Sequence, residues 1–262
     1  MTTFAVDPGP LARAFSLTCQ HLDSIGAADA LWQERLDIWA DDPDTRRVIA
    51  NRLGWLRALD AATPEVPRLR AFAADIRDHG YERVVLMGMG GSSLAPEVLR
   101  SVVGVAPGYP RFVMLDTVNP AAVRAAFADQ ARTLYVVASK SGTTIEPVSL
   151  AAEARRIASA GAGWSAHTVA ITDRDTALHR EALQDKFRDV FVNPADIGGR
   201  YSALSLFGMV PAALMGADLD GLVASGRAME RECRRPEAAA NAGLALGALM
   251  AAAAANGRDK LT

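Results

Sequence analysis

The sequence predicts an α/β fold in which a parallel, flavodoxin-like doubly wound sheet lies between two layers of helices. Two observations support this prediction. From residue 81 onward, short apolar runs alternate with helical patterns, as in right-handed β–α–β crossovers. Before residue 80 and after residue 199, only helical spacing is found. We therefore expect a three-layer sandwich flanked by N-terminal and C-terminal helices.

Three regions are expected along the chain. They are an N-terminal helical segment over residues 1–80, an α/β domain over 81–216, and C-terminal helices over 217–262. In the first region the apolar spacing predicts helices over 10–22, 31–39, 41–56 and 66–78. In the second, apolar runs predict strands over 84–87, 112–115, 134–138, 168–171 and 190–192. Further helices are predicted over 94–103, 120–130, 144–160, 175–187, 202–216, 218–233 and 237–256.

The composition excludes several classes of function. A formal charge of −2 provides no basic field for nucleic acid. Cys19 and Cys233 are too few for a disulfide framework and favour a reducing, cytoplasmic compartment. The apolar run over residues 238–255 is mostly alanine and glycine, which favours a packed helix over a membrane span.

The stretch RVVLMGMGGSSLAP, residues 83–96, predicts a buried strand, a glycine turn and a helix start. Glycines at 88, 90 and 91 let backbone N–H groups approach a ligand. Ser92 and Ser93 offer hydroxyls and a possible N-cap, and Pro96 fits a first helical turn. Because a helix N-terminus attracts negative charge, this turn predicts an anion site.

The loop SKSGTTIEP, residues 139–147, adds a second anion site signal. Several hydroxyls surround Lys140 and Gly142 just after a buried strand, which favours a dianion held mostly by neutral donors. Lys140 would add a charge or only its backbone N–H. The alternative is a capping box in which Thr143 caps the helix and Glu146 reaches back, with no ligand.

Two further features leave alternatives open. The glycine turn nearly matches G-x-G-x-x-G, with Ser93 at the third glycine, and Asp116 ends the next strand where a ribose-binding acid would lie. An NAD-dependent dehydrogenase is therefore a competing hypothesis. In DIGGRYS, residues 196–202, Arg200 could stabilise an oxyanion or simply pair with Asp196.

The motifs GMGGSSLAP, SKSGTTIE and GGRYS, in this order and spacing, resemble the phosphoglucose isomerase family, whose members contain paired sugar-isomerase (SIS) domains. The resemblance covers nearly the whole chain. The N-terminal piece, with LGWL at 53–56, is similar to the isomerase part of bacterial transaldolase–phosphoglucose isomerase fusions. Ser141 and Gly142 depart from the threonine and aromatic residue of many members, and both changes keep a phosphate cradle plausible.

The resemblance implies interconversion of glucose 6-phosphate and fructose 6-phosphate through a cis-enediol, with no metal and no redox cofactor. The family's substrate-binding positions fall on Gly91, Ser92, Ser139, Lys140, Ser141 and Thr144. The family's arginine beside the reacting sugar carbons falls on Arg200. The implied partners are a sugar phosphate, a second copy in a homodimer, or a covalently linked second SIS domain and transaldolase.

The resemblance also implies that the base glutamate, the ring-opening histidine and a late lysine lie in a second SIS domain, beyond Thr262. The four histidines, at positions 21, 79, 167 and 179, are interpreted as structural. We therefore expect the N-terminal part of an isomerase, which binds sugar phosphate weakly and turns it over poorly or not at all. A non-catalytic SIS module that senses a phosphosugar is the alternative.

Overall fold

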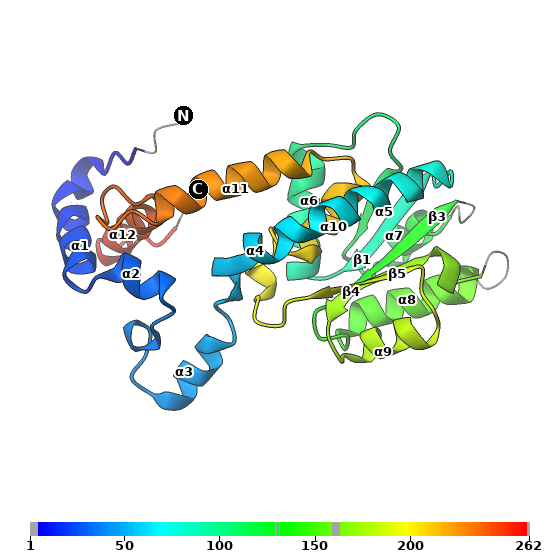
Figure 1. The fold of residues 1–262 in the computed structure, drawn as a ribbon, viewed down its shortest axis with the longest axis horizontal. Coiled ribbons are helices and arrows are strands. Elements are labelled where there is room, and N and C mark those ends of the chain that lie inside the picture. Colours follow the sequence, from blue (N-terminus) through cyan, green and yellow to red (C-terminus); the bar gives the residue numbers. More distant parts are fainter. Residues whose placement is uncertain (1–4, 129, 131, 159–162, 261–262) are drawn as a thin grey trace. The chain divides into compact units, whose positions relative to one another are not determined.

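The computed structural model describes residues 5–128, 130, 132–158 and 163–260 (Figure 1). The chain divides into two compact units. Residues 51–223 form the unit that carries the sheet, and residues 1–50 with 224–262 form a helical unit. Residues 51–80, grouped in the sequence analysis with the N-terminal helices, thus belong to the same unit as the sheet.

The sheet has five parallel strands in the order β2-β1-β3-β4-β5. This order is the flavodoxin-like arrangement, so the predicted fold class is confirmed. In the second strand of this order, Val84 lies opposite Phe112 on one side and Leu134 on the other. The strands are β1 (Arg83–Gly88), β2 (Arg111–Leu115), β3 (Thr133–Ala138), β4 (Thr168–Asp173) and β5 (Asp189–Asn193).

Two layers of helices cover the sheet, as Figure 1 shows. On one face, Leu69 and Ile76 pack in a core with Phe191, while on the other Tyr135 packs with Trp164. Because both faces are covered, every residue of β3 and β4 is buried, which explains their continuous apolar runs. The first layer contains α5 (Val66–Asp78), α6 (Gly91–Val102) and α10 (Leu206–Leu214), and the second contains α7 (Pro120–Ala126), α8 (Ile145–Ala158) and α9 (Ala177–Gln184).

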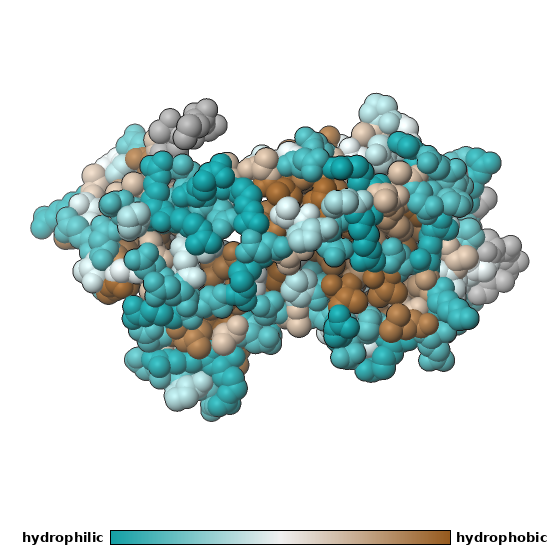
Figure 2. All heavy atoms as spheres, in the orientation of Figure 1, coloured by the Kyte–Doolittle hydropathy of each residue, from teal (hydrophilic) through white to brown (hydrophobic). Residues whose placement is uncertain are grey.

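Short helices complete the sheet-bearing unit. They are η3 (Gly54–Arg57), α4 (Ala58–Ala62), η4 (Thr63–Glu65), η5 (Ser165–His167) and η6 (Gly199–Tyr201). Of these, η6 follows β5, and the β-bridge between Leu53 and Ile197 holds η3 close to the loop after that strand. Figure 2 shows brown, apolar patches interrupting the teal surface of this unit.

The helical unit is closed by contacts between its two chain segments. The indole Nε1 of Trp32 donates a hydrogen bond to the carbonyl oxygen of Cys233 at 2.9 Å, and Asp23 accepts one from the amide of Ala238 at 2.7 Å. Cys19 and Cys233 are free thiols. Its elements are η1 (Gly9–Leu11), α1 (Ala12–Ser24), α2 (Ala27–Trp32), η2 (Leu36–Ile38), α3 (Pro43–Ala50), α12 (Ala242–Ala255) and most of α11 (Leu219–Cys233).

Several predicted helices are shorter than expected, and two of them show the physical reason. The helix predicted over 31–39 breaks after Trp32, because Glu34 adopts a left-handed conformation with φ of 55°. The helix predicted over 41–56 ends at Ala50, because buried Leu53 instead forms a β-bridge with Ile197. Within the described part of the chain, no helix combines the length and apolar character needed to cross a membrane.

Candidate functional site

A pocket of about 560 Å³ opens at the carboxyl ends of the strands in the sheet-bearing unit. Ligands of open α/β sheets bind at this edge. The loops after β1, β3, β4 and β5 all contribute to the pocket, as does the segment just before η3. Its lining residues are Asn51, Arg52, Met89, Gly91, Ser92, Lys140, Ser141, Thr144, Asp173, Arg174, Thr176, Ala195, Gly199 and Phe207.

The glycine turn after β1 brings the N-terminus of α6 to this pocket. Gly90, with φ of 56°, is the N-cap residue, so the expected serine N-cap is wrong. The hydroxyl of Ser93 instead donates back to the carbonyl of Gly90 at 3.0 Å, while Ser92 lines the pocket. Pro96 lies in the second helical turn, one turn later than expected. A Cβ on Gly91 would overlap the backbone of Gly199, so this contact requires glycine.

In the loop after β3, two hydroxyl residues line the pocket and a third is buried within the loop. Ser141 and Thr144 line the pocket. Ser139 is buried, and its Oγ accepts a hydrogen bond from the amide of Gly142 at 3.1 Å and donates to Thr144 Oγ1 at 3.5 Å. Ser139 thus shapes the loop and is not among the residues that line the pocket, and its expected contact with a ligand stays a prediction.

The capping box predicted for this loop does not form. α8 begins at Ile145, so Thr144 occupies the N-cap position, and its carbonyl accepts the first helical hydrogen bond from Val148 at 3.2 Å. The hydroxyl of Thr143 donates to Ser141 Oγ at 3.0 Å instead of capping the helix. The capping interpretation was wrong because the helix starts one residue later than the Thr143–Glu146 pair requires.

Lys140 points its ammonium group at Asp173. The distance from Nζ to Asp173 Oδ2 is 2.5 Å, and Nζ also donates to the carbonyl of Ala195 at 2.7 Å. Burial raises the pKa of the Asp173 carboxyl, while the hydrogen bond from Lys140 acts in the opposite direction. The charge of Lys140 is thus largely neutralised by a carboxylate of the same pocket.

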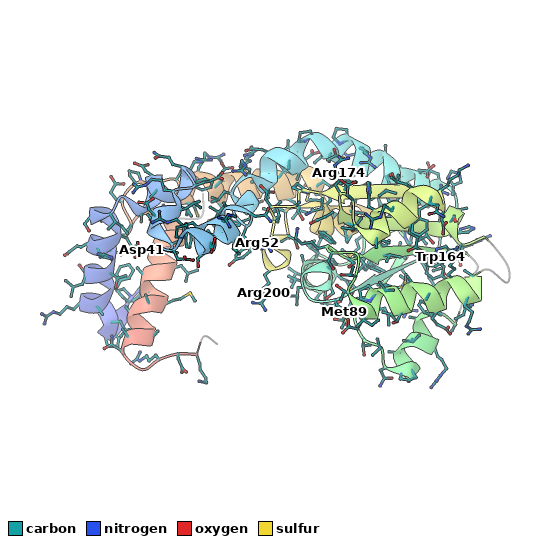
Figure 3. All side chains as sticks on the ribbon, turned by 90° about the horizontal axis from the view of Figure 1, so that it is seen from below. Asp41, Arg52, Met89, Trp164, Arg174 and Arg200 are labelled. Carbon is teal, nitrogen blue, oxygen red and sulfur yellow. The ribbon has the colours of Figure 1, made fainter. Side chains whose placement is uncertain are left out.

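Arg200 lies in η6, beside the pocket rather than in it. It lines a neighbouring, mainly apolar depression of about 280 Å³ together with Leu94 and Val98. The alternative pairing with Asp196 is wrong, because the carboxylate of Asp196 binds Arg57 at 3.0 Å. Among the residues that the structure describes, Arg200 makes no ion pair, and Figure 3 shows its side chain projecting from its loop.

A sequence profile of the family described as Phosphoglucose isomerase matches residues 75–259, more than half of the chain. The chain belongs to the phosphoglucose isomerase family. It is 31% identical over 215 residues to glucose-6-phosphate isomerase of Citrifermentans bemidjiense, covering 74% of this chain and 40% of that relative. It is 33% identical over 216 residues to the same enzyme of Parasynechococcus marenigrum, covering 74% and 39%. The chain thus spans about 40% of the length of these curated relatives.

Solved structures agree with the fold. A hypothetical protein from Thermus thermophilus is 27% identical with a TM-score of 0.73, covering 92% of this chain and 56% of that one. A glucose-6-phosphate isomerase from Chlamydia trachomatis is 23% identical with a TM-score of 0.70, covering 94% and 50%. The α/β sandwich predicted from the sequence is therefore also the fold of a phosphoglucose isomerase.

The dinucleotide hypothesis has little support from the geometry of this family member. Asp116 follows β2 and lines a separate groove with Glu97, Arg100 and Arg111. It does not line the pocket formed by the glycine turn. A ribose-binding acid would have to face that same crevice.

The described histidines lie outside the pocket, which agrees with their interpretation as structural. His79 Nδ1 lies 3.1 Å from a carboxylate oxygen of Asp75, and His167 Nδ1 lies 2.8 Å from the hydroxyl of Tyr81. His179 is buried at the start of α9. None of the described histidines lines the pocket.

Sequence reasoning missed three charged residues that line the pocket, Arg52, Asp173 and Arg174. Asp173 is the last residue of β4 and Arg174 follows it, so the rule that sites lie at strand ends could have identified both. Arg52 directly precedes LGWL, a motif that the sequence analysis noted without assigning it a role. In Figure 3, Arg52, Met89, Arg174 and Arg200 come from different segments of the sheet-bearing unit.

Proposed function

We propose that this chain provides the phosphate-binding part of a glucose-6-phosphate isomerase, which interconverts glucose 6-phosphate and fructose 6-phosphate. The observation that carries the proposal is that Ser92, Ser141 and Thr144 line one pocket at the start of two helices. Hydroxyls and helix N-terminal amides are the donors that a phosphate dianion prefers. Membership of the phosphoglucose isomerase family supplies the substrate class.

In the proposed reaction, the phosphate anchors the open-chain sugar while a base moves a proton between C2 and C1 through a cis-enediol. Binding a remote phosphate supplies orientation at the reacting carbons. Arg200, with no carboxylate partner among the described residues, would offset the negative charge on the enediol oxygens. The base and the ring-opening group would come from a second SIS domain. A cytoplasmic location is part of this proposal.

One observation favours a second candidate, a non-catalytic phosphosugar-sensing module. Asp173 is the carboxylate among the described lining residues of the pocket, and Lys140 already holds it. A sensor needs a pocket of this kind and no base. A gene that encodes a second SIS domain with a glutamate base after this segment would favour the enzyme over the sensor.

Thermal-shift titration distinguishes the ligand classes. We expect the purified chain to be stabilised by fructose 6-phosphate and 6-phosphogluconate, because ligands that bind only the folded state raise its melting temperature. Fructose, which lacks the phosphate, is the matched control and should have no effect. Stabilisation by NAD alone would contradict both phosphosugar hypotheses.

A further inference from the structure

Arg52 lines the phosphate pocket from a segment outside the sheet. Its Nη1 donates a hydrogen bond to the carbonyl oxygen of Asn51 at 2.8 Å. Its Cδ lies 3.8 Å from the position that a Cβ on residue 198 would occupy, so the side chain runs along Gly198. The side chain of Arg52 thus contacts Asn51, runs along Gly198 and reaches the pocket.

The segment that carries Arg52 is fixed to the loop after β5. Leu53 forms a β-bridge with Ile197, and the amide of Gly54 donates to the carbonyl of Asp196 at 3.1 Å. A Cβ on Gly54 would overlap the carboxylate of Asp196, so the approach requires glycine. These contacts hold the backbone next to Arg52 at the edge of the pocket.

Side-chain contacts strengthen the same attachment. Arg57 pairs with Asp196 at 3.0 Å, and the rings of Trp55 and Tyr201 stack with centroids 5.6 Å apart. Residues 53–57, which are the LGWL motif and Arg57, therefore attach this segment to the loop after β5, and we call them the clasp. The clasp places Arg52 and the loop that carries Arg200 beside one another.

The charged residues of the pocket show which cations are available to bind an anionic ligand. Lys140 and Asp173 neutralise each other at 2.5 Å. Of the described residues that line the pocket, Arg52 and Arg174 are the cations that form no ion pair, although the charge of Arg52 also lowers the pKa of Asp173. Both arginines are exposed, but Arg52 directly precedes Leu53, whose β-bridge with Ile197 fixes the backbone, whereas Arg174 lies between β4 and α9. Arg52 is thus the better fixed of the two.

We propose that Arg52 is a substrate-binding residue whose guanidinium contacts the phosphate of a sugar phosphate held by Ser92, Ser141 and Thr144. The inference rests on the proposed function and adds one binding group to it. A guanidinium suits this task because its planar set of donors matches phosphate oxygens. The clasp holds the backbone beside Arg52 at the edge of the pocket before the ligand arrives, which reduces the ordering cost on binding.

The test is calorimetric titration of the folded chain with fructose 6-phosphate and with inorganic phosphate. Arg52→Gln should lower the affinity for both ligands by about tenfold to a hundredfold, because one charge-assisted hydrogen bond is lost. Arg52→Lys should retain part of the affinity. Arg124→Gln, which removes an exposed arginine on α7, is the matched control and should bind as the original chain does.

Salt dependence separates a charge contact from a structural role. The affinity of the original chain should fall more steeply with added salt than that of Arg52→Gln, because one screened contact is missing in the variant. If the original chain binds fructose 6-phosphate and Arg52→Gln binds it equally well, the inference is wrong and the proposed function stands. If the original chain binds neither ligand, the proposed function fails with it.

Discussion

The hydroxyl of Ser202 donates a hydrogen bond to the carbonyl oxygen of Gly91 at 3.1 Å, which joins the loop after β5 to the glycine turn after β1. The same two loops touch where Gly91 meets Gly199 without space for a side chain. Gly91 and Gly199, which come from distant parts of the sequence, thus both line the pocket. The following prediction tests this contact.

Gly91→Ala should lower the free energy of unfolding by about 1–3 kcal/mol, because a methyl group is forced against the backbone of Gly199. It should also weaken the binding of fructose 6-phosphate. Urea denaturation and titration measure the two effects. Gly247→Ala in α12 is the control, since its methyl group would meet no atom within 4 Å. It should be stabilising by about 0.5–1 kcal/mol. A Gly91→Ala variant with unchanged stability and affinity would disprove the contact.

In the loop after β3, we expect some hydroxyls to contribute mainly to ligand binding and one to contribute mainly to stability. Ser141→Ala and Thr144→Val should each weaken phosphate binding by about threefold to tenfold, because these side chains line the pocket. Each should lower the unfolding free energy by less than Ser139→Ala does, because the hydrogen bonds that their hydroxyls accept from Thr143 and Ser139 are less buried. Ser139→Ala should instead destabilise the protein by about 1–2 kcal/mol, since a buried hydrogen bond from Gly142 loses its acceptor. Equal effects of all three variants on binding and stability would argue against this division.

Asp173→Asn should tighten the binding of inorganic phosphate by about threefold to tenfold, because the charge of Lys140 is then no longer neutralised. Titration at constant ionic strength measures this effect. Asp175→Asn, which changes an exposed carboxylate in the next turn, is the control. Weaker phosphate binding by Asp173→Asn would show that the ion pair supports the pocket rather than lowering its positive charge.

The buried Asp173 also predicts a pH dependence. Its pKa is raised in the folded state above the ordinary value of 3.8, mainly by burial, so the folded protein holds this proton more tightly than the unfolded chain. Its contribution to stability is therefore fully present below pH 3.8 and is lost as the pH rises through the raised pKa. Asp173→Asn should remove this part of the pH profile measured by urea denaturation. An unchanged profile would assign it to other groups.

An apolar stripe on α6 predicts self-association of the isolated chain. Leu94, Val98 and Val102 recur every four residues and are 58%, 59% and 79% exposed. Because a contiguous apolar surface favours association, sedimentation should show larger species at higher concentration. Val98→Glu should shift the distribution toward monomer, whereas Val48→Glu, on an exposed site of α3, should not. Identical sedimentation of both variants and the original chain would contradict this role.

The positions of the strands were predictable because a doubly covered sheet imposes uninterrupted apolar runs on its strands, as in residues 134–138. The loops that carry Ser92, Ser141 and Thr144 were predictable because strand ends set the place of the site. The end of α3 was not, because Leu53 is pulled into a bridge with Ile197, which is distant in sequence.

The site was predicted only in part for the same reason. Ser139 and Ser141 look equivalent in the sequence, and only burial separates the loop-shaping hydroxyl from the one that faces the pocket. Arg52 could not be assigned, because its position depends on contacts of Gly54 with Asp196, which lies far along the chain. The burial of Ser139 and the position of Arg52 both depend on contacts between residues far apart in sequence, which local sequence patterns do not predict.

The central claim, that the loops after β1 and β3 together bind the phosphate of a sugar phosphate, is tested most directly by amide chemical shifts. The chain is titrated with fructose 6-phosphate, and fructose is the control. We predict saturable shifts at Gly91, Ser92, Ser141 and Thr144 that fructose does not produce. Saturable shifts confined to other parts of the chain, or none at these four amides, would contradict the claim.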